Sequence, residues 1–194
     1  MIIGISGKAE SGKDTAAKML EVIYGNPEIS FDDYANRRYN KFADINTVHF
    51  ADTLKEATQV MCHIGEWETN TQEGKKTTID WLGITVREFL QKFGTCVRMG
   101  IDNLFWIKET FANVDDWKNV IIADVRFPEE IEAIKERGGI ILRLERDSAG
   151  AGNHISEVAL DDYTGWNKVI DNNNSLLLLF DQLKQFAKEH PLDE

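Results

Sequence analysis

The stretch that decides the fold is Ile2-Ile3-Gly4-Ile5-Ser6-Gly7-Lys8-Ala9-Glu10-Ser11-Gly12-Lys13-Asp14-Thr15. Its apolar beginning predicts a buried strand over Ile2–Ser6, and apolar residues at helical spacing predict a helix over Asp14–Tyr24. Between them stands the pattern of a phosphate-binding loop, in which glycines let backbone N–H groups curl around phosphate and a lysine reaches the β- and γ-phosphates. We therefore predict a P-loop for a nucleoside triphosphate, ATP above all, formed by Gly7, Lys8, Ser11, Gly12, Lys13, Asp14 and Thr15.

Position 14 departs from that pattern. Asp14 stands where a serine or threonine usually holds Mg²⁺, and Thr15 follows one residue late. A carboxylate close to a triphosphate is repulsive unless a cation lies between them. Two alternatives stay open: Asp14 approaches Mg²⁺, directly or through water, or it turns away as a residue at the helix N-terminus.

A second candidate ligand for Mg²⁺ follows another apolar run. Val120–Ala123 is typical of a buried parallel strand, and Asp124 comes directly after it. A carboxylate at that place can orient Mg²⁺ and its waters beside the phosphates. The alternative is an aspartate that caps the following turn. Asp14 and Asp124 together make up the predicted metal site.

Strands and helices alternate along most of the chain. Further strands are predicted at Thr47–Phe50, Ile140–Leu144 and Lys168–Asp171, and further helices at Asp52–Cys62, Glu129–Arg137 and Ser175–Glu189. Such alternation predicts an α/β fold, with a parallel sheet of about five strands and helices on both faces. One domain spanning residues 1–194 is expected.

Residues 65–113 break the alternation. Residues 65–83 are polar and indicate a loop or small insertion, whereas residues 84–113 have the pattern of two helices with no strand between them. Ligands of parallel sheets bind beyond the carboxyl ends of the strands, so extra material there usually covers a second substrate. We predict that residues 65–113 form a mostly helical insertion that binds an acceptor.

The charge and composition of the chain limit the kinds of partner that we expect. The formal net charge is −11, from 22 Lys+Arg against 33 Asp+Glu, and no basic run offsets it. Such a chain repels duplex nucleic acid, so we expect small phosphorylated molecules and no nucleic-acid polymer as partners. Cys62 and Cys96 lack metal-ligand spacing and suit reduced thiols of a cytoplasmic protein. No stretch approaches the length of a membrane span. The oligomeric state stays open, a homodimer included.

Six motifs carry a resemblance to a known family. They are Gly12-Lys13-Asp14-Thr15, Phe50-Ala51-Asp52-Thr53-Leu54-Lys55, Arg87-Glu88-Phe89-Leu90-Gln91, Gly94-Thr95-Cys96-Val97-Arg98, Asp124-Val125-Arg126-Phe127-Pro128-Glu129-Glu130 and His154-Ile155-Ser156-Glu157. From residue 2 to about residue 180 the chain resembles the deoxynucleoside monophosphate kinases of tailed bacteriophages and their bacterial relatives. The resemblance implies a three-layer P-loop kinase fold with an ATP core, an acceptor-binding region and a mobile lid. The departure at Asp14 from the usual P-loop pattern is also shared with the family that the chain resembles.

The candidate acceptor site is a helix face. Arg87, Gln91 and Arg98 fall on one side of a helix, where they suit a monophosphate and a base edge, although a solvated charged face is the alternative. Gly94 shares that side and is expected to leave room for a ligand. Two residues of the second motif, Asp52 and Lys55, complete the predicted acceptor-binding set.

Arginines and an amide follow the later strands. Arg126 comes after the third strand and Arg146 after the fourth, and with Lys13 they are the predicted catalytic residues, because arginines there can neutralise the transferred phosphoryl group. Residues 146–157 are a predicted lid, or else a plain connection. Asn172 follows the fifth strand, where the resemblance implies contact with the donor base; a turn before a helix capped by Ser175 is the alternative. Arg143 lies within a strand and is expected to be structural.

Three functions are compatible with these residues. The preferred one is ATP-dependent phosphoryl transfer to deoxynucleoside 5′-monophosphates, giving the deoxynucleoside diphosphate and ADP. The alternative is a P-loop kinase of an alcohol, similar to dephospho-coenzyme A kinases, with Asp52 as general base. A nucleotide-dependent switch is disfavoured because the arginines suit transfer. Rejection of ribose would need a wall at the 2′-position, for which the candidates are Trp81, Phe105 and Trp106.

Overall fold

The computed structural model describes residues 1–39, 44–114, 116–147 and 154–192. The chain divides into two compact units, one made of Met1–His49 with Asp116–Glu194 and the other of Phe50–Asp115. The predicted insertion, residues 65–113, lies inside the second unit, which begins at Phe50. Within the described residues, no helix combines the length and the apolar character that crossing a bilayer requires.

The first unit contains a five-stranded parallel sheet, as predicted. Its strands are β2 (Asn46–Val48), β5 (Val120–Val125), β1 (Ile2–Ser6), β6 (Ile140–Glu145) and β7 (Lys168–Asp171), in that spatial order. Ile3 of the middle strand β1 is paired with Ile121 on one side and with Ile140 on the other. The loop that follows β1 is therefore placed at the centre of the carboxyl edge, where ligands of such sheets bind.

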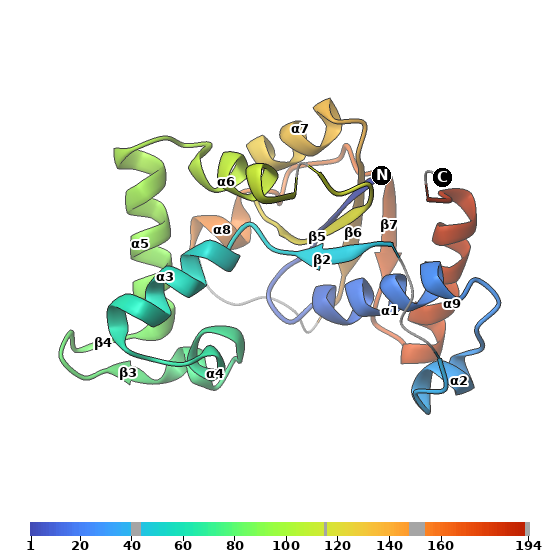
Figure 1. Ribbon diagram of the computed structural model, residues 1–194, viewed down its shortest axis with the longest axis horizontal. Helices are drawn as coiled ribbons and strands as arrows, with labels where there is room; N and C mark the ends of the chain where they lie inside the picture. Colours follow the sequence, from blue (N-terminus) through green and yellow to red (C-terminus); the bar gives the residue numbers. More distant parts are fainter. Residues whose placement is uncertain (40–43, 115, 148–153, 193–194) are drawn as a thin grey trace. The chain divides into compact units, whose positions relative to one another are not determined.

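Helices cover both faces of this sheet (Figure 1). Helices α1 (Lys13–Gly25) and α9 (Leu176–Glu189) pack together on one face, and α7 (Pro128–Glu136) covers the other. Leu20 of α1, Phe186 of α9 and Ile134 of α7 are fully buried. Apolar side chains on both faces of the strands thus meet apolar helix stripes, which confirms the predicted three-layer α/β fold.

Some boundaries differ from the sequence-based prediction. Strand β2 ends at Val48 rather than Phe50, because Phe50 turns away to pack its ring against Phe111 of the second unit, 6.1 Å between centroids. Strand β5 continues to Val125, so Asp124 lies within the strand and not after it. A short helix that was not predicted, α2 (Phe31–Ala35), begins where the Ser30 hydroxyl accepts a hydrogen bond from the Asp33 amide.

The second unit is mostly helical. It contains α3 (Asp52–Cys62), α4 (Glu66–Asn70), the 3₁₀ turn η1 (Gly74–Lys76), the hairpin of β3 (Thr78–Ile79) with β4 (Ile84–Thr85), α5 (Val86–Gly100) and α6 (Phe105–Val114). The polar stretch 65–83 is thus structured. Helix α5 begins with a reciprocal cap, because Thr85 Oγ1 accepts from the Glu88 amide while the Glu88 carboxylate accepts from the Thr85 amide.

Candidate active site

The P-loop joins β1 to α1, and its two glycines are needed for its shape. Gly12 has φ 96°, in the left-handed region, and a Cβ there would lie 2.6 Å from Nδ2 of Asn172. A Cβ on Gly7 would lie 2.3 Å from Oγ of Ser11 and 2.8 Å from the carbonyl oxygen of Leu144. Only glycine fits at either position without displacing a neighbour, as a loop that curls around phosphate requires.

Lys13 is the charge at the centre of the site. Its side chain is nearly buried, and Nζ donates to the carbonyl oxygens of Gly7 at 2.7 Å and Lys8 at 2.8 Å. Burial, and after it the positive charge of Arg126, lowers the pKa of Lys13 to about 8. The carboxylates of Glu157, Asp14 and Asp124 act in the opposite direction. These charged groups therefore surround one poorly solvated ammonium, which an arriving anion would stabilise.

The two predicted Mg²⁺ ligands lie near this ammonium. Asp14 is in the first turn of α1 with its side chain 76% exposed, and its Oδ1 lies 3.0 Å from Nε2 of His49. Asp124 is half-buried in β5. Mg²⁺ favours one or two carboxylates together with phosphate oxygens and water, so this donor set fits it. Among the described residues no cluster of three metal-binding side chains is present, and the role of both carboxylates stays a prediction.

Asn172, directly after the edge strand β7, supports the P-loop. Its Nδ2 donates to the carbonyl oxygen of Ser11 at 2.8 Å, and its backbone N–H donates to the backbone carbonyl oxygen of Glu145 at 2.8 Å. The side chain is buried beside Gly12, so the contact with a donor base stays a prediction. The helix cap that the alternative prediction required is present, because Ser175 Oγ accepts a hydrogen bond from the Leu178 amide at the start of α9. Thr15 lies in the first turn of α1, half-buried.

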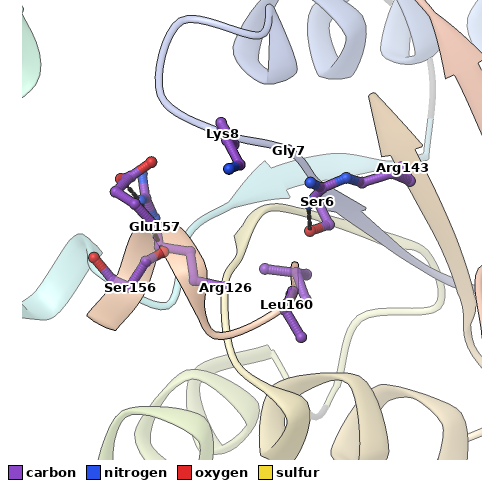
Figure 2. A pocket seen from close by; sticks show the side chains of 9 residues that line it. Ser6, Gly7, Lys8, Arg126, Arg143, Ser156, Glu157 and Leu160 are labelled. Carbon is purple, nitrogen blue, oxygen red and sulfur yellow. Dashed lines mark hydrogen bonds and ion pairs between the residues drawn. The ribbon is translucent and has the colours of Figure 1, made fainter. Parts of the chain in front are cut away.

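A pocket opens beside the P-loop at the carboxyl ends of β1, β5 and β6 (Figure 2). Its lining is rich in cations and consists of Ser6, Gly7, Lys8, Val125, Arg126, Arg143, Ser156, Glu157 and Leu160. Arg143 donates to Ser6 Oγ at 3.1 Å and lies over the Trp166 ring, 5.1 Å from its centroid. Burial lowers the pKa of Arg143. These contacts suit the structural role that its place within a strand predicts.

Arg126, a predicted catalytic residue, is paired with a carboxylate that sequence reasoning did not assign. Its Nη1 forms an ion pair with Glu157 Oε1, and Glu157 Oε2 accepts from the P-loop amide of Ala9 at 2.9 Å. Glu157 belongs to α8 (Ile155–Val158). The available signal in the sequence was that Glu157 lies in the motif His154-Ile155-Ser156-Glu157, but a single glutamate has no spacing that reveals a partner.

The predicted lid is described only at its ends. Arg146 is exposed just after β6, and residues 148–153 lie outside the described residues. His154 caps α8, with Nδ1 accepting from the Ser156 amide at 3.3 Å, and the helix begins at Ile155. The catalytic role of Arg146 and the lid stay predictions.

The predicted acceptor residues lie on two helices of the second unit. Asp52 and Lys55 are paired on α3, Oδ1 to Nζ 3.0 Å. Arg87, Gln91 and Arg98 all belong to α5, and Arg87 Nη2 donates to Gln72 Oε1 at 2.6 Å. The sequence pattern did not single out Gln72.

The expectation of room at Gly94 is wrong. A Cβ on Gly94 would lie 3.0 Å from Cδ2 of Leu54, and Trp106 Nε1 donates to the Gly94 carbonyl oxygen at 3.2 Å. The glycine allows α3 and α6 to pack closely on α5, and leaves no space for a ligand. Trp106 is core and Phe105 packs edge-on against it, whereas Trp81 is exposed in the β3–β4 turn.

Comparison with known proteins fits this arrangement. Residues 29–183 match the family model described as deoxynucleotide monophosphate kinase. The chain is 30% identical, over 94% of its length and 94% of the relative's, to a protein of Acanthamoeba polyphaga mimivirus named "Putative deoxynucleotide monophosphate kinase". It is also 32% identical to the uncharacterized protein ORF77 of Ictalurid herpesvirus 1, over 52% of this chain and 47% of that one. The family match starts after the P-loop, whose assignment rests on the geometry above. With most of its length matched, the chain belongs to the deoxynucleotide monophosphate kinase family and is a kinase.

Proposed function

We propose that this kinase transfers the γ-phosphoryl group of ATP to a deoxynucleoside 5′-monophosphate, yielding the deoxynucleoside diphosphate and ADP. The observation that carries the proposal is the buried ammonium of Lys13 in a glycine-shaped loop, with Arg126 and Asp124 close enough to shift its pKa. This set of charges suits the binding of the donor triphosphate. The match to the deoxynucleotide monophosphate kinase family supports the choice of acceptor. As the sequence analysis predicts, we place the reaction in the cytoplasm.

The donor role follows from the electrostatics of the loop. Lys13 bridges two loop carbonyls, and burial holds its pKa near 8, so its ammonium gains more from a phosphate oxygen than a solvated lysine would. The backbone amides of the loop supply further donors around the same oxygens. Arg126 adds a second cation that can neutralise charge on the transferred group.

Asp14 and Asp124 would hold Mg²⁺ in this scheme. When bound, Mg²⁺ neutralises phosphate charge and orders the oxygens for in-line displacement. The two carboxylates favour the ammonium form of Lys13 and so act against its repulsion by the second cation, Arg126.

The acceptor requires positioning rather than activation. Its attacking atom is a phosphate oxygen that is already anionic at neutral pH, so no general base is needed. Arg87, Gln91 and Arg98 on α5, with Asp52 and Lys55 on α3, are the residues we assign to it. The alcohol-acceptor alternative is not favoured: the family match points elsewhere, and Asp52, the base it needs, is paired with Lys55.

A coupled assay of ADP release tests the proposal. Deoxynucleoside monophosphates should be phosphorylated, the alcohol acceptor dephospho-coenzyme A should not, and Lys13→Ala should reduce turnover by orders of magnitude while the protein stays folded. A paired comparison of kcat/KM for dGMP, dTMP and dCMP with GMP, UMP and CMP measures the deoxy preference. Near-normal turnover by Lys13→Ala would remove the donor assignment, and activity on an alcohol alone would restore the alternative.

A further inference from the structure

Glu157 lies between two parts of the site that come from different strands. One carboxylate oxygen accepts from the Ala9 N–H of the P-loop, and the other pairs with the guanidinium of Arg126, which follows β5. Figure 2 shows Arg126 and Glu157 joined at one side of the cation-rich pocket. The carboxylate therefore ties the arginine to the loop that surrounds Lys13.

The environment of this carboxylate fixes it in place. The Glu157 side chain is 8% exposed, and a buried carboxylate is tolerated only where hydrogen bonds and an opposite charge compensate it. Here both oxygens have such a partner. Moving the carboxylate away would leave Arg126 and the Ala9 amide without these partners.

Arg126 is held at both its ends. Its backbone N–H donates to Glu130 Oε2 at 2.6 Å, while Nη1 contacts Glu157 and, at 3.4 Å, the carbonyl oxygen of Ser156. An arginine carries five N–H donors in a rigid planar fork. Within the described part of the chain the guanidinium uses only Nη1, so Nε and Nη2 remain for a ligand in the pocket that Arg126 lines.

We propose that Glu157 is a positioning residue for phosphoryl transfer: it fixes the guanidinium of Arg126 relative to the P-loop and so directs the other N–H donors at the transferred group. This inference rests on the proposed function, and Glu157 acts through Arg126 without touching the substrate. A carboxylate that only occupied the place of a phosphate would behave differently, because removing it would strengthen ATP binding and leave kcat intact.

Glu157→Gln is the direct test. The substitution keeps an oxygen that can accept from the Ala9 N–H but removes the charge opposite Arg126. We expect kcat to fall about ten- to a hundredfold, the loss typical of one charge-assisted pair, with the KM for ATP nearly unchanged. Glu132→Gln is the matched control, since Glu132 is an exposed glutamate on α7, and it should behave as wild type.

A double-mutant cycle with Arg126→Ala gives the second readout. If Glu157 acts through Arg126, adding Glu157→Gln to Arg126→Ala causes no further loss of kcat. The inference would be overturned if the double variant lost kcat by the product of the two single losses. It would also be overturned by an unchanged kcat in Glu157→Gln, or by tighter ATP binding without loss of kcat. If Glu157→Gln does not fold, Glu157→Asp, which keeps the charge on a shorter stem, should show the same fall in kcat alone. Failure of the wild type to phosphorylate any monophosphate would instead overturn the proposed function.

Discussion

Asn172 at the end of β7 donates its side-chain amide to the carbonyl oxygen of Ser11 at 2.8 Å, and so ties the last strand of the sheet to the P-loop. The family resemblance implies instead that Asn172 touches the donor base, with a turn before the helix capped by Ser175 as the alternative. The two roles have different consequences for nucleotide selectivity, and they can be separated by experiment.

Replacing Asn172 by alanine should weaken the binding of ATP and the binding of GTP to the same extent. The Ser11 carbonyl oxygen would lose a buried donor, at a cost of about 1–3 kcal/mol, and the loop would lose rigidity whatever the base. Equilibrium binding of both nucleotides measures this, and the exposed Asn174→Ala serves as the control. A changed ATP:GTP ratio would instead support contact with the base.

ATP binding should take up a proton at alkaline pH. Burial holds the pKa of Lys13 at about 8 in the free protein, and a bound triphosphate favours the ammonium and raises this pKa. Affinity is therefore highest below pH 8 and falls as the pH rises through that value. Calorimetry at about pH 9 in buffers of different ionisation enthalpy measures the uptake. Binding heats that do not depend on the buffer would contradict this, and Lys13→Ala should abolish the uptake.

Asparagine at position 14 or 124 should raise the Mg²⁺ concentration needed for half-maximal rate. The substitution keeps the shape of the side chain but removes the charge that attracts the cation. Mg²⁺ titrations of initial rate at saturating ATP provide the measurement. Curves of both variants that overlay the wild type would show that neither carboxylate serves the metal.

Arg87→Ala or Arg98→Ala should weaken the use of the acceptor and leave the binding of the donor ATP unchanged. Loss of one charge-assisted pair to the monophosphate raises its KM, or lowers kcat, by about ten- to a hundredfold, with the KM for ATP unchanged. Lys92→Ala is the control, because Lys92 is an exposed cation on the same helix α5. Equal weakening of both substrates would mean that these arginines support the fold.

The central strands of the sheet could be predicted because they are largely apolar. Val120–Ala123 is buried throughout, and within Ile140–Leu144 only Ile140 and Arg143 are half-buried, so hydrophobicity indicates both strands. The β3–β4 hairpin could not be predicted in this way, because strands of two residues are too short to show a period.

The P-loop could be predicted because its chemistry depends on local spacing. Glu157 and His49 were not predicted, because a carboxylate 148 positions from Ala9 and an imidazole 35 positions from Asp14 become partners only through the tertiary fold. Gly94 shows the converse. A helical glycine on a polar face was interpreted as space for a ligand, and only the position of Leu54 reveals that it serves helix packing.

The pairing of β1 has a consequence for how the protein folds. Ile2 pairs with Val120 and Ile3 with Ile140, so β1 leaves the ribosome long before either of its neighbours. Such distant pairings form slowly, since a long loop must close before they contribute. Until β6 and β7 are made, the P-loop also lacks Leu144, against which Gly7 packs, and Asn172, which holds Ser11. The nascent chain therefore carries its P-loop for most of its synthesis without the contacts that shape it, and the loop has all of these contacts only when Asn172, directly after the last strand, is in place.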